Sequence, residues 1–374
     1  MGVRKAQKVA VGVAAVHLAC LGQPAMGGSV TPLPLSAADR PATSSFAWYD
    51  ARLLTVEGKG YNDTEQFWQR LPARAKGKVP PAVWDLSKHT AGICVRFVTD
   101  STTIAAEWDG VTALKMNHMA FSGSAGLDLY RRTGRGWRYV ATGRPQDHRT
   151  SQVLISKAPA GFSEYLLHLP PYHPTTSLRI GIDPAAKLAP AAPRSPERAK
   201  PIVFYGTSIT QGGCASRAGM GHVMILGRWL DRPVINLGFS GSGKGEPEVL
   251  DLVNELDAAV FVLEPLPNMT TEQVRERLPM WVEKLRTNHP QTPILLVENP
   301  LKSRRDEQNR ALQKVFADAR KKGIARLYLL PADKQLAGRE EGTVDGVHPT
   351  DLGFVRMAEC YAPVLRRLLS LSGE

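Results

Sequence analysis

From residue 201 onward, short apolar segments alternate with longer amphipathic segments. Because this alternation is typical of strands that each lead into a helix, it predicts a parallel sheet covered by helices on both faces. The expected strands span 202–205, 234–237, 259–263, 294–297 and 327–330, and the expected helices span 221–230, 246–255, 271–288, 305–322 and 349–369. Residues 201–374 are therefore predicted to form an α/β domain with its own core.

The part of the chain before this domain has a different pattern. Between residues 28 and 183, short β-prone segments are separated by turns, and no long helical period occurs. A hairpin is expected where 126–130 and 137–140 flank the glycine-containing turn 133–136. This spacing predicts an antiparallel β-sandwich or jelly roll. Residues 184–200, rich in proline, alanine and charge, are predicted to be a solvated linker between the two domains.

The first 27 residues have the pattern of a secretory signal peptide. Arg4, Lys5 and Lys8 precede the apolar run 9–21, and small residues follow it. The run is shorter than a transmembrane helix needs. We therefore expect export to the periplasm or the extracellular space, with no membrane span once the signal is removed.

The distribution of charge and the few cysteines bear on whether the protein binds nucleic acid or a metal. The net charge is +12 at neutral pH, but the basic residues are scattered among acidic ones, which favours a solvated surface over a nucleic-acid-binding patch. Beyond the signal, Cys94, Cys214 and Cys360 define no disulfide framework, and no group of cysteines and histidines has metal-ligand spacing in the sequence. We expect neither a nucleic-acid partner nor a metal.

Polar residues and glycine follow the expected strands of the α/β domain. Ser208 follows the first strand, Gly241 the second and Asn268 the third, while Asp345 and His348 lie between the fifth strand and the last helix. Ligands of open α/β sheets bind in the crevice beyond the carboxyl ends of the strands. The sequence therefore predicts one site at this edge of the sheet.

These residue types suit acyl transfer. A serine hydroxyl becomes a good nucleophile when a neighbouring base accepts its proton, and His348 can accept it from Ser208. Asp345 can then hold the other ring nitrogen and stabilise the imidazolium. The backbone N–H groups of Ser208 and Gly241 and the side-chain amide of Asn268 can donate to an oxyanion.

Each of these residues also has a plain structural interpretation. Gly241 can simply relieve a tight turn, and Asn268 can cap the helix that follows it. Asp345 can belong only to a turn, and His348 only to a helix start with proline at its first position. The catalytic hypothesis depends on all of these residues meeting at one edge of one sheet.

The order of these residues resembles that of a known family, the SGNH or GDSL-like hydrolases. The matching blocks are Gly206-Thr207-Ser208, Gly241, Asn268 and Asp345-x-x-His348. Upstream, residues 126–130, with the sequence Gly-Leu-Asp-Leu-Tyr, resemble the GxDLY signature of the β-sandwich domain that precedes one branch of this superfamily. The two matches cover nearly all of the chain after the expected signal.

The resemblance implies a flavodoxin-like, doubly wound sheet of five parallel strands and an active site that needs no metal or other cofactor. It implies that Ser208 is the nucleophile and that His348, oriented by Asp345, is the base. It also implies that Ser208, Gly241 and Asn268 are the oxyanion donors. The chain departs from the family in having Thr207 where aspartate is usual, Leu266-Pro267 in place of glycines, and Ser242 in place of a frequent asparagine.

Further residues are candidates for substrate contact because they lie on loops around the expected site or can reach it from the sandwich. They are Gln211, Arg217, Lys244, His118 and Tyr130. For His118 the favoured interpretation is a histidine whose hydrogen bonds are satisfied within the sandwich. Cys214 is expected to be a small buried residue, since no separate base for it is evident.

These observations predict an exported serine esterase that forms an acyl-enzyme on Ser208. Its expected substrates are O-acyl esters of a small molecule or a carbohydrate, with acetyl on carbohydrate as the expected case by analogy. The same residues would serve an acyltransferase, or a lipase or thioesterase for longer chains, although no long apolar lid is evident. A non-catalytic carbohydrate-binding protein on the same scaffold is the competing class.

Overall fold

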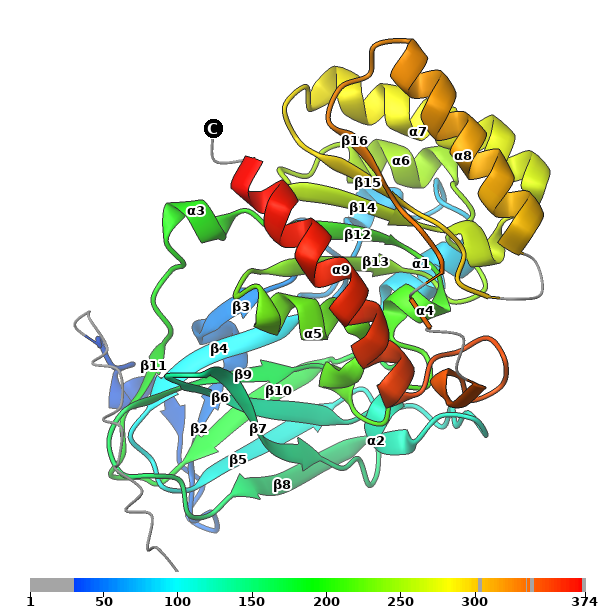
Figure 1. The fold of residues 1–374 in the computed structure, drawn as a ribbon. Helices are drawn as coiled ribbons and strands as arrows, with labels where there is room; N and C mark the ends of the chain where they lie inside the picture. Colours follow the sequence, from blue (N-terminus) through cyan, green and yellow to red (C-terminus); the bar gives the residue numbers. More distant parts are fainter. Residues whose placement is uncertain (1–29, 302–304, 334, 337–339, 372–374) are drawn as a thin grey trace, which may run out of the picture.

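The computed structural model describes residues 30–301, 305–333, 335–336 and 340–371. The predicted signal peptide, residues 1–27, lies outside these ranges. Within them, two antiparallel sheets precede a five-stranded parallel sheet that is flanked by helices (Figure 1). No helix in the described ranges has both the length and the apolar character that a membrane span requires.

The antiparallel sheets form the predicted β-sandwich. One sheet has the strand order β1-β2-β10-β5-β8, and the other has the order β11-β4-β9-β6-β7 with β3 paired to β4. The strands are β1 (Ala38–Asp39), β2 (Ala47–Asp50), β3 (Thr55–Glu57), β4 (Cys94–Thr99), β5 (Ile104–Asp109), β6 (Leu127–Thr133), β7 (Gly136–Gly143), β8 (Arg149–Ile155), β9 (Ser163–His168), β10 (Ser177–Ile182) and β11 (Leu188–Pro190). Alternate side chains of the two sheets, such as Phe97 and Trp108, share one buried cluster. The predicted hairpin joins β6 to β7.

The parallel sheet has the predicted flavodoxin-like order, β13-β12-β14-β15-β16. Its strands are β12 (Ile202–Gly206), β13 (Val234–Gly238), β14 (Val260–Glu264), β15 (Ile294–Val297) and β16 (Leu327–Leu330). Along β12, Val203 and Tyr205 belong to the core on one face, while Ile202 and Phe204 belong to the core on the other. A continuous apolar run is therefore needed, because both faces of the strand are buried.

Helices cover both faces of this sheet. α6, α7 and α8 pack on one face, and α5 and α9 pack on the other (Figure 1). The helices that cover the sheet are α5 (His222–Trp229), α6 (Pro247–Val253), α7 (Thr271–Asn288), α8 (Arg305–Lys321) and α9 (Asp351–Leu371), and the other α-helices are α1 (Pro81–Ser87), α2 (Phe121–Ser124), α3 (Pro196–Ala199) and α4 (Ser208–Gln211). Single 3₁₀ turns occur at η1 (Leu35–Ala37), η2 (Ala51–Leu53), η3 (Ala73–Ala75), η4 (Ala218–Met220), η5 (Leu266–Asn268) and η6 (Glu340–Gly342).

One segment of the predicted sandwich domain contributes to the core of the α/β domain instead. Tyr61, Leu71 and Val83, the last of which lies on α1, belong to the same buried cluster as Ile235 of the edge strand β13. The Tyr61 hydroxyl also donates to the carbonyl oxygen of Leu252 at 2.7 Å. The physical reason is that apolar side chains at the sheet edge need a cover, and this segment supplies it. The boundary between the two cores does not follow the order of the chain.

Arg70 binds the segment that contains Tyr61, Leu71 and Val83 to β13. Its buried guanidinium donates to the carbonyl oxygens of Asn236 at 2.9 Å and Gly238 at 2.8 Å. It also donates to the carbonyl oxygens of Leu86 and His89. Burial lowers the pKa of Arg70 to about 9, and the carbonyl oxygens replace the water that the charged group has lost.

The segment predicted as a solvated linker, 184–200, differs from that expectation in its first half. It contains the edge strand β11, which pairs with β4, and Leu188 is buried. Arg194 forms an ion pair with Glu57 at 2.8 Å. Proline is compatible with an edge strand because a missing N–H there breaks no ladder, so the proline-rich composition concealed this strand. α3, in the second half, has no buried residue.

The GxDLY residues lie at the contact between the sandwich and the α/β domain. Asp128 is fully buried, and its Oδ2 accepts hydrogen bonds from Nη1 of Arg217 at 2.9 Å, the backbone N–H of Gly219 at 3.0 Å and the hydroxyl of Tyr130 at 3.0 Å. Burial raises the pKa of Asp128, although Arg217 opposes the rise. This signature therefore ties β6 to the loop that follows α4.

Replacing Asp128 with alanine should lower the free energy of unfolding by about 2–3 kcal/mol, because Arg217 and the Gly219 N–H lose their acceptor at a buried contact. Chemical denaturation of wild type, Asp128→Ala, Arg217→Ala and the double variant measures both the loss and the coupling between the two side chains. If the stability loss of the double variant equals the sum of the losses of the two single variants, the interaction between Asp128 and Arg217 contributes no stability of its own.

Candidate active site

Ser208, His348 and Asp345 meet at the carboxyl-end edge of the parallel sheet. Ser208 is the first residue of α4 after β12, and the other two lie in the loop before α9. The Oγ of Ser208 lies 2.9 Å from Nε2 of His348, and Nδ1 of His348 lies 2.8 Å from Oδ2 of Asp345. Both distances are those of hydrogen bonds. The structure thus links the three side chains that the sequence singled out.

The turn that carries Ser208 is held by its neighbours. The hydroxyl of Thr207 accepts from the N–H of Ile209, and the hydroxyl of Thr210 accepts from the N–H of Thr207. Thr207 therefore provides the helix cap where the related family usually has aspartate. Gly206 is required by space, since a β-carbon there would lie 2.0 Å from the Thr210 hydroxyl oxygen.

The loop before α9 holds the carboxylate of Asp345 in place. Its Oδ1 accepts from the backbone N–H groups of His348 at 2.8 Å and Val347 at 3.0 Å. Partial burial raises the pKa of Asp345, but the hydrogen bonds from the His348 ring and from these N–H groups outweigh it and lower the pKa to about 2. Asp345 is therefore a carboxylate at neutral pH and can fix the tautomer of the imidazole.

Two residues beside the triad were not among the predicted site residues. The hydroxyl of Tyr172, from the sandwich domain, donates to the carbonyl oxygen of Ser208 at 3.2 Å. Gly213 lies so close to the triad that a β-carbon there would be 2.8 Å from the Tyr172 hydroxyl and 3.1 Å from Cδ2 of His348. The glycine pair at 212–213 was visible as a turn signal, but nothing local to Tyr172 marks its role.

Candidate oxyanion donors lie on Ser208 itself and on the loops that follow β13 and β14. Within the described residues, the backbone N–H groups of Ser208 and Gly241 donate to no protein acceptor. Gly241 has a φ of +68°, and the space where its β-carbon would be is open. The side-chain amide of Asn268 donates to the carbonyl oxygen of Ser242, which connects η5 to the loop of Gly241. The helix cap of α7 is Thr270, so Asn268 does not have that alternative role.

A buried carboxylate braces the nucleophile turn from inside. Glu264, at the end of β14, accepts from Nε2 of His222 at 3.0 Å and from the hydroxyl of Tyr361 at 2.6 Å. Burial raises the pKa of Glu264, but His222 and hydrogen bonds, including one from Thr210, bring it below its ordinary value. Thr210 in turn caps α4. The sequence does not mark this group, because the partners of Glu264 come from helices far along the chain.

Gln211 has a different role from the predicted one. It is fully buried, its Nε2 donates to the carbonyl oxygen of Pro171 at 2.9 Å, and its Oε1 accepts from the N–H of Ser240 at 3.0 Å. Gln211 therefore holds the loop that carries Gly241 and is not exposed to a substrate. Lys244 lies half-buried on the same loop, and its carbonyl oxygen accepts from Arg277 at 2.8 Å. Its contact with substrate stays a prediction.

The candidates from the sandwich side divide into two groups. Tyr130 and Arg217 bind each other and Asp128 in the interdomain contact, so these polar groups are not available to a substrate in the way predicted. Burial raises the pKa of Tyr130 to about 12. His118, by contrast, reaches the site, with its ring centroid 5.4 Å from that of His348. It is an exposed residue over the triad and not a buried histidine of the sandwich.

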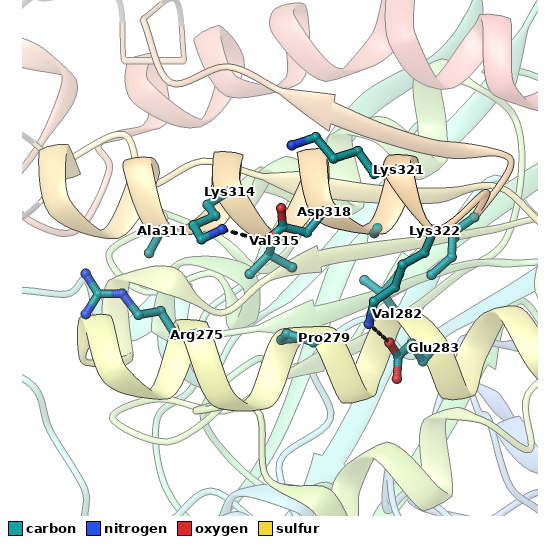
Figure 2. A pocket seen from close by; sticks show the side chains of 12 residues that line it. Arg275, Pro279, Val282, Glu283, Ala311, Lys314, Val315, Asp318, Lys321 and Lys322 are labelled. Atoms are coloured by element: carbon teal, nitrogen blue, oxygen red, sulfur yellow. Dashed lines mark hydrogen bonds and ion pairs between the residues drawn. The ribbon is translucent and has the colours of Figure 1, made fainter.

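A separate groove of about 510 Å³ runs between α7 and α8. Figure 2 shows its rim, where Lys314 pairs with Asp318 and Lys322 pairs with Glu283. Its lining includes none of the residues at the ends of the strands. The groove is therefore distinct from the site built around Ser208.

Comparisons with known proteins identify the families that both domains match. The profile of the GDSL-like lipase/acylhydrolase family matches residues 199–366, and the profile of the GxDLY N-terminus of SGNH-hydrolase-type esterases matches residues 46–188. A search of curated proteins found no match.

Solved structures extend the comparison over both domains. A GDSL-like lipase from Bacteroides ovatus is 32% identical, with a TM-score of 0.82, and the alignment covers 87% of this chain and 98% of that one. A salicylyl-acyltransferase from a tetracycline biosynthetic pathway is 20% identical, with a TM-score of 0.70, and covers 88% and 98%. A family two carbohydrate esterase from Clostridium thermocellum is 15% identical, with a TM-score of 0.58, and covers 75% and 94%. Since both profiles and the Bacteroides structure match the described fold, the chain belongs to the GDSL-like (SGNH) hydrolase family and carries that family's GxDLY N-terminal domain.

Proposed function

We propose that this protein is a serine esterase in which Ser208 is the nucleophile. The observation that carries the proposal is the continuous hydrogen-bonded chain from Ser208 through His348 to Asp345. The backbone N–H groups of Ser208 and Gly241, which have no protein acceptor within the described residues, add to it. The family profile that matches residues 199–366 is one of GDSL-like lipases and acylhydrolases, which supports an ester-cleaving enzyme.

The geometry supports the following steps. His348 takes the proton of Ser208 as Oγ attacks the ester carbonyl carbon, and Asp345 stabilises the imidazolium that forms. The oxyanion accepts hydrogen bonds from the N–H groups of Ser208 and Gly241 and from the amide of Asn268. The imidazolium then returns the proton to the leaving alcohol. Water, activated by the same imidazole, releases the acid and restores Ser208.

Acetyl groups on carbohydrate are the proposed substrate. One support is analogy, because a carbohydrate esterase solved with cellohexaose shares this fold. The other is that the sandwich domain of this protein brings His118 and Tyr172 to the site. An acyltransferase is the second candidate, favoured by the likeness of both domains to the salicylyl-acyltransferase. In that case an alcohol would replace water as the acceptor.

Export is part of the proposal. Its support is the basic start, apolar run and small residues of the first 27 residues.

Product analysis separates these candidates. We expect the wild-type protein to release acetate from p-nitrophenyl acetate and from an acetylated oligosaccharide. Release of acetate from p-nitrophenyl acetate alone would support an esterase but would contradict the carbohydrate substrate. An acylated alcohol formed in preference to acetate, when both acceptors are present, would identify an acyltransferase. Carbohydrate binding without turnover of any ester would identify a non-catalytic protein.

Asn268→Ala should lower kcat by about 100-fold with little change in KM, because the lost amide donates to the oxyanion only as negative charge develops. Steady-state kinetics with p-nitrophenyl acetate measure both constants. Gln273→Ala, which removes a capping side chain of α7 close in sequence, serves as the control and should leave kcat within about twofold. A rise in KM alone would make Asn268 a substrate-positioning residue.

A further inference from the structure

Three side chains with metal-binding atoms converge beside the triad. His118 comes from the sandwich loop before α2, Cys214 from the loop after α4, and His348 from the loop before α9. One nitrogen or sulfur atom from each lies within 4.8 Å of the others. The sequence spacing of these residues does not show this arrangement, because they are brought together only by the packing of the two domains.

The donor set fits a thiophilic cation. Histidine nitrogen and cysteine sulfur are the commonest protein ligands of Zn²⁺, and three protein ligands with an open fourth position are a stable coordination pattern. Zinc–ligand bonds of roughly 2.0–2.3 Å hold neighbouring ligand atoms closer together than 4.8 Å, so the three side chains would draw together around the ion.

The outer contacts of His348 also suit a metal ligand. Its Nδ1 is bonded to the carboxylate of Asp345, which leaves Nε2 as the nitrogen that can bind a cation. A carboxylate on the far nitrogen is the usual second contact of a metal-bound histidine, since it orients the ring and raises its basicity. The same Nε2 is the atom that contacts Oγ of Ser208.

The backbone conformation of Cys214 points the same way. The residue is 7% exposed and packs against Met119 and Tyr172, with Met116 beside them. Its φ is +71°, in the left-handed region that is costly for a residue other than glycine, and such conformations cluster at functional sites. Ester hydrolysis by the triad uses neither this thiol nor the imidazole of His118.

We propose that His118, Cys214 and His348 bind one Zn²⁺ ion and that the bound ion inhibits the enzyme by occupying Nε2 of His348. Binding displaces the thiol proton to solvent, and the imidazole can no longer accept the proton of Ser208. The binding part of the proposal stands on the donor geometry alone, whereas the inhibition part rests on the proposed esterase function.

Binding is measured on the full chain after removal of metal by a chelator. Zn²⁺ should bind at one equivalent by competition with a chromophoric chelator, and Co²⁺ should give a thiolate-to-cobalt charge-transfer band. Cys214→Ser and His118→Ala should each weaken Zn²⁺ binding by at least about tenfold, and the first should abolish the band. Cys360→Ser and His148→Ala, which replace the same residue types elsewhere, should bind as wild type.

Inhibition is measured in parallel as the ratio of p-nitrophenyl acetate turnover with and without Zn²⁺, so that differences in basal activity cancel. Zn²⁺ should inhibit wild type reversibly, and the inhibitory concentration should rise at least about tenfold in Cys214→Ser and His118→Ala. Binding that is absent, or unchanged in both variants, overturns the site. Binding at this site without inhibition overturns the regulatory role. A protein without any esterase activity would refute the proposed function, while the binding measurements would still decide the metal site.

Discussion

Ser208→Ala is expected to lower kcat for ester hydrolysis by about 10⁴-fold or more while leaving the fold intact. The triad acts as a unit, so removing its nucleophile removes the acyl-enzyme route, and only binding and oxyanion stabilisation remain. The hydroxyl is a small group on a residue that is 6% exposed, and its partner is the His348 ring at the surface of the site. Loss of this one oxygen should therefore change the thermal midpoint very little.

The measurement is hydrolysis of p-nitrophenyl acetate, with acyl-enzyme trapping followed by mass spectrometry of the intact chain. Wild type should show one added acetyl group at short times, and Ser208→Ala should show none. Ser370→Ala is the matched control, since it removes an exposed hydroxyl near the end of α9, where that hydroxyl donates to the carbonyl oxygen of Arg367. Residual turnover in Ser208→Ala near the wild-type rate would mean that another residue is the nucleophile.

Asp345→Asn should lower kcat by about 10⁴-fold near neutral pH. The amide is almost the same size as the carboxylate, but it carries no charge to stabilise the imidazolium and can present a donor to Nδ1 of His348. The ring is then held in the wrong tautomer, with Nε2 protonated and unable to accept the proton of Ser208. A loss of less than about tenfold would show that Asp345 only shapes the loop.

The pH dependence of activity tests the charge of Asp345 separately from its shape. Because the pKa of Asp345 is lowered to about 2, its carboxylate stays charged as the pH falls from 7 to 4. The stabilisation from its pairing with His348 is present above the ordinary carboxyl range and is lost only as the pH falls toward about 2. Loss of wild-type activity between pH 7 and 4 should therefore not come from protonation of Asp345. Asp333→Asn, an exposed carboxylate outside the triad, is the control and should follow the wild-type profile.

The α/β domain could be predicted in detail because its signals are local. Each strand is an apolar run such as 202–205, each helix has its own apolar stripe, and the rules for connecting parallel strands leave few arrangements. Once those strands are parallel, their carboxyl ends meet, so Ser208, Gly241 and Asn268 must lie at one edge. The hairpin at 133–136 was predictable for a similar reason, since its turn chemistry lies within a few residues.

The structure alone decided how the two domains share residues. No periodicity in 61–86 indicates that this segment covers the edge strand β13, and the prolines of 184–200 conceal the pairing of β11. Contacts of this kind depend on complementary shape and charge between segments far apart in the chain, and a single sequence does not encode them in any local pattern.

The amino-acid sequence by itself determined the fold class and the three residues that form the hydrogen-bonded chain, because both follow from strand order and local spacing. Only the tertiary structure decided which other residues join them. In the tertiary structure, Tyr172 and His118 lie at the site. Gln211 is buried, and Arg217 binds Asp128 in the contact between the domains. The physical reason is that domain packing, driven by burial of apolar surface and by satisfaction of buried charges, sets these positions globally.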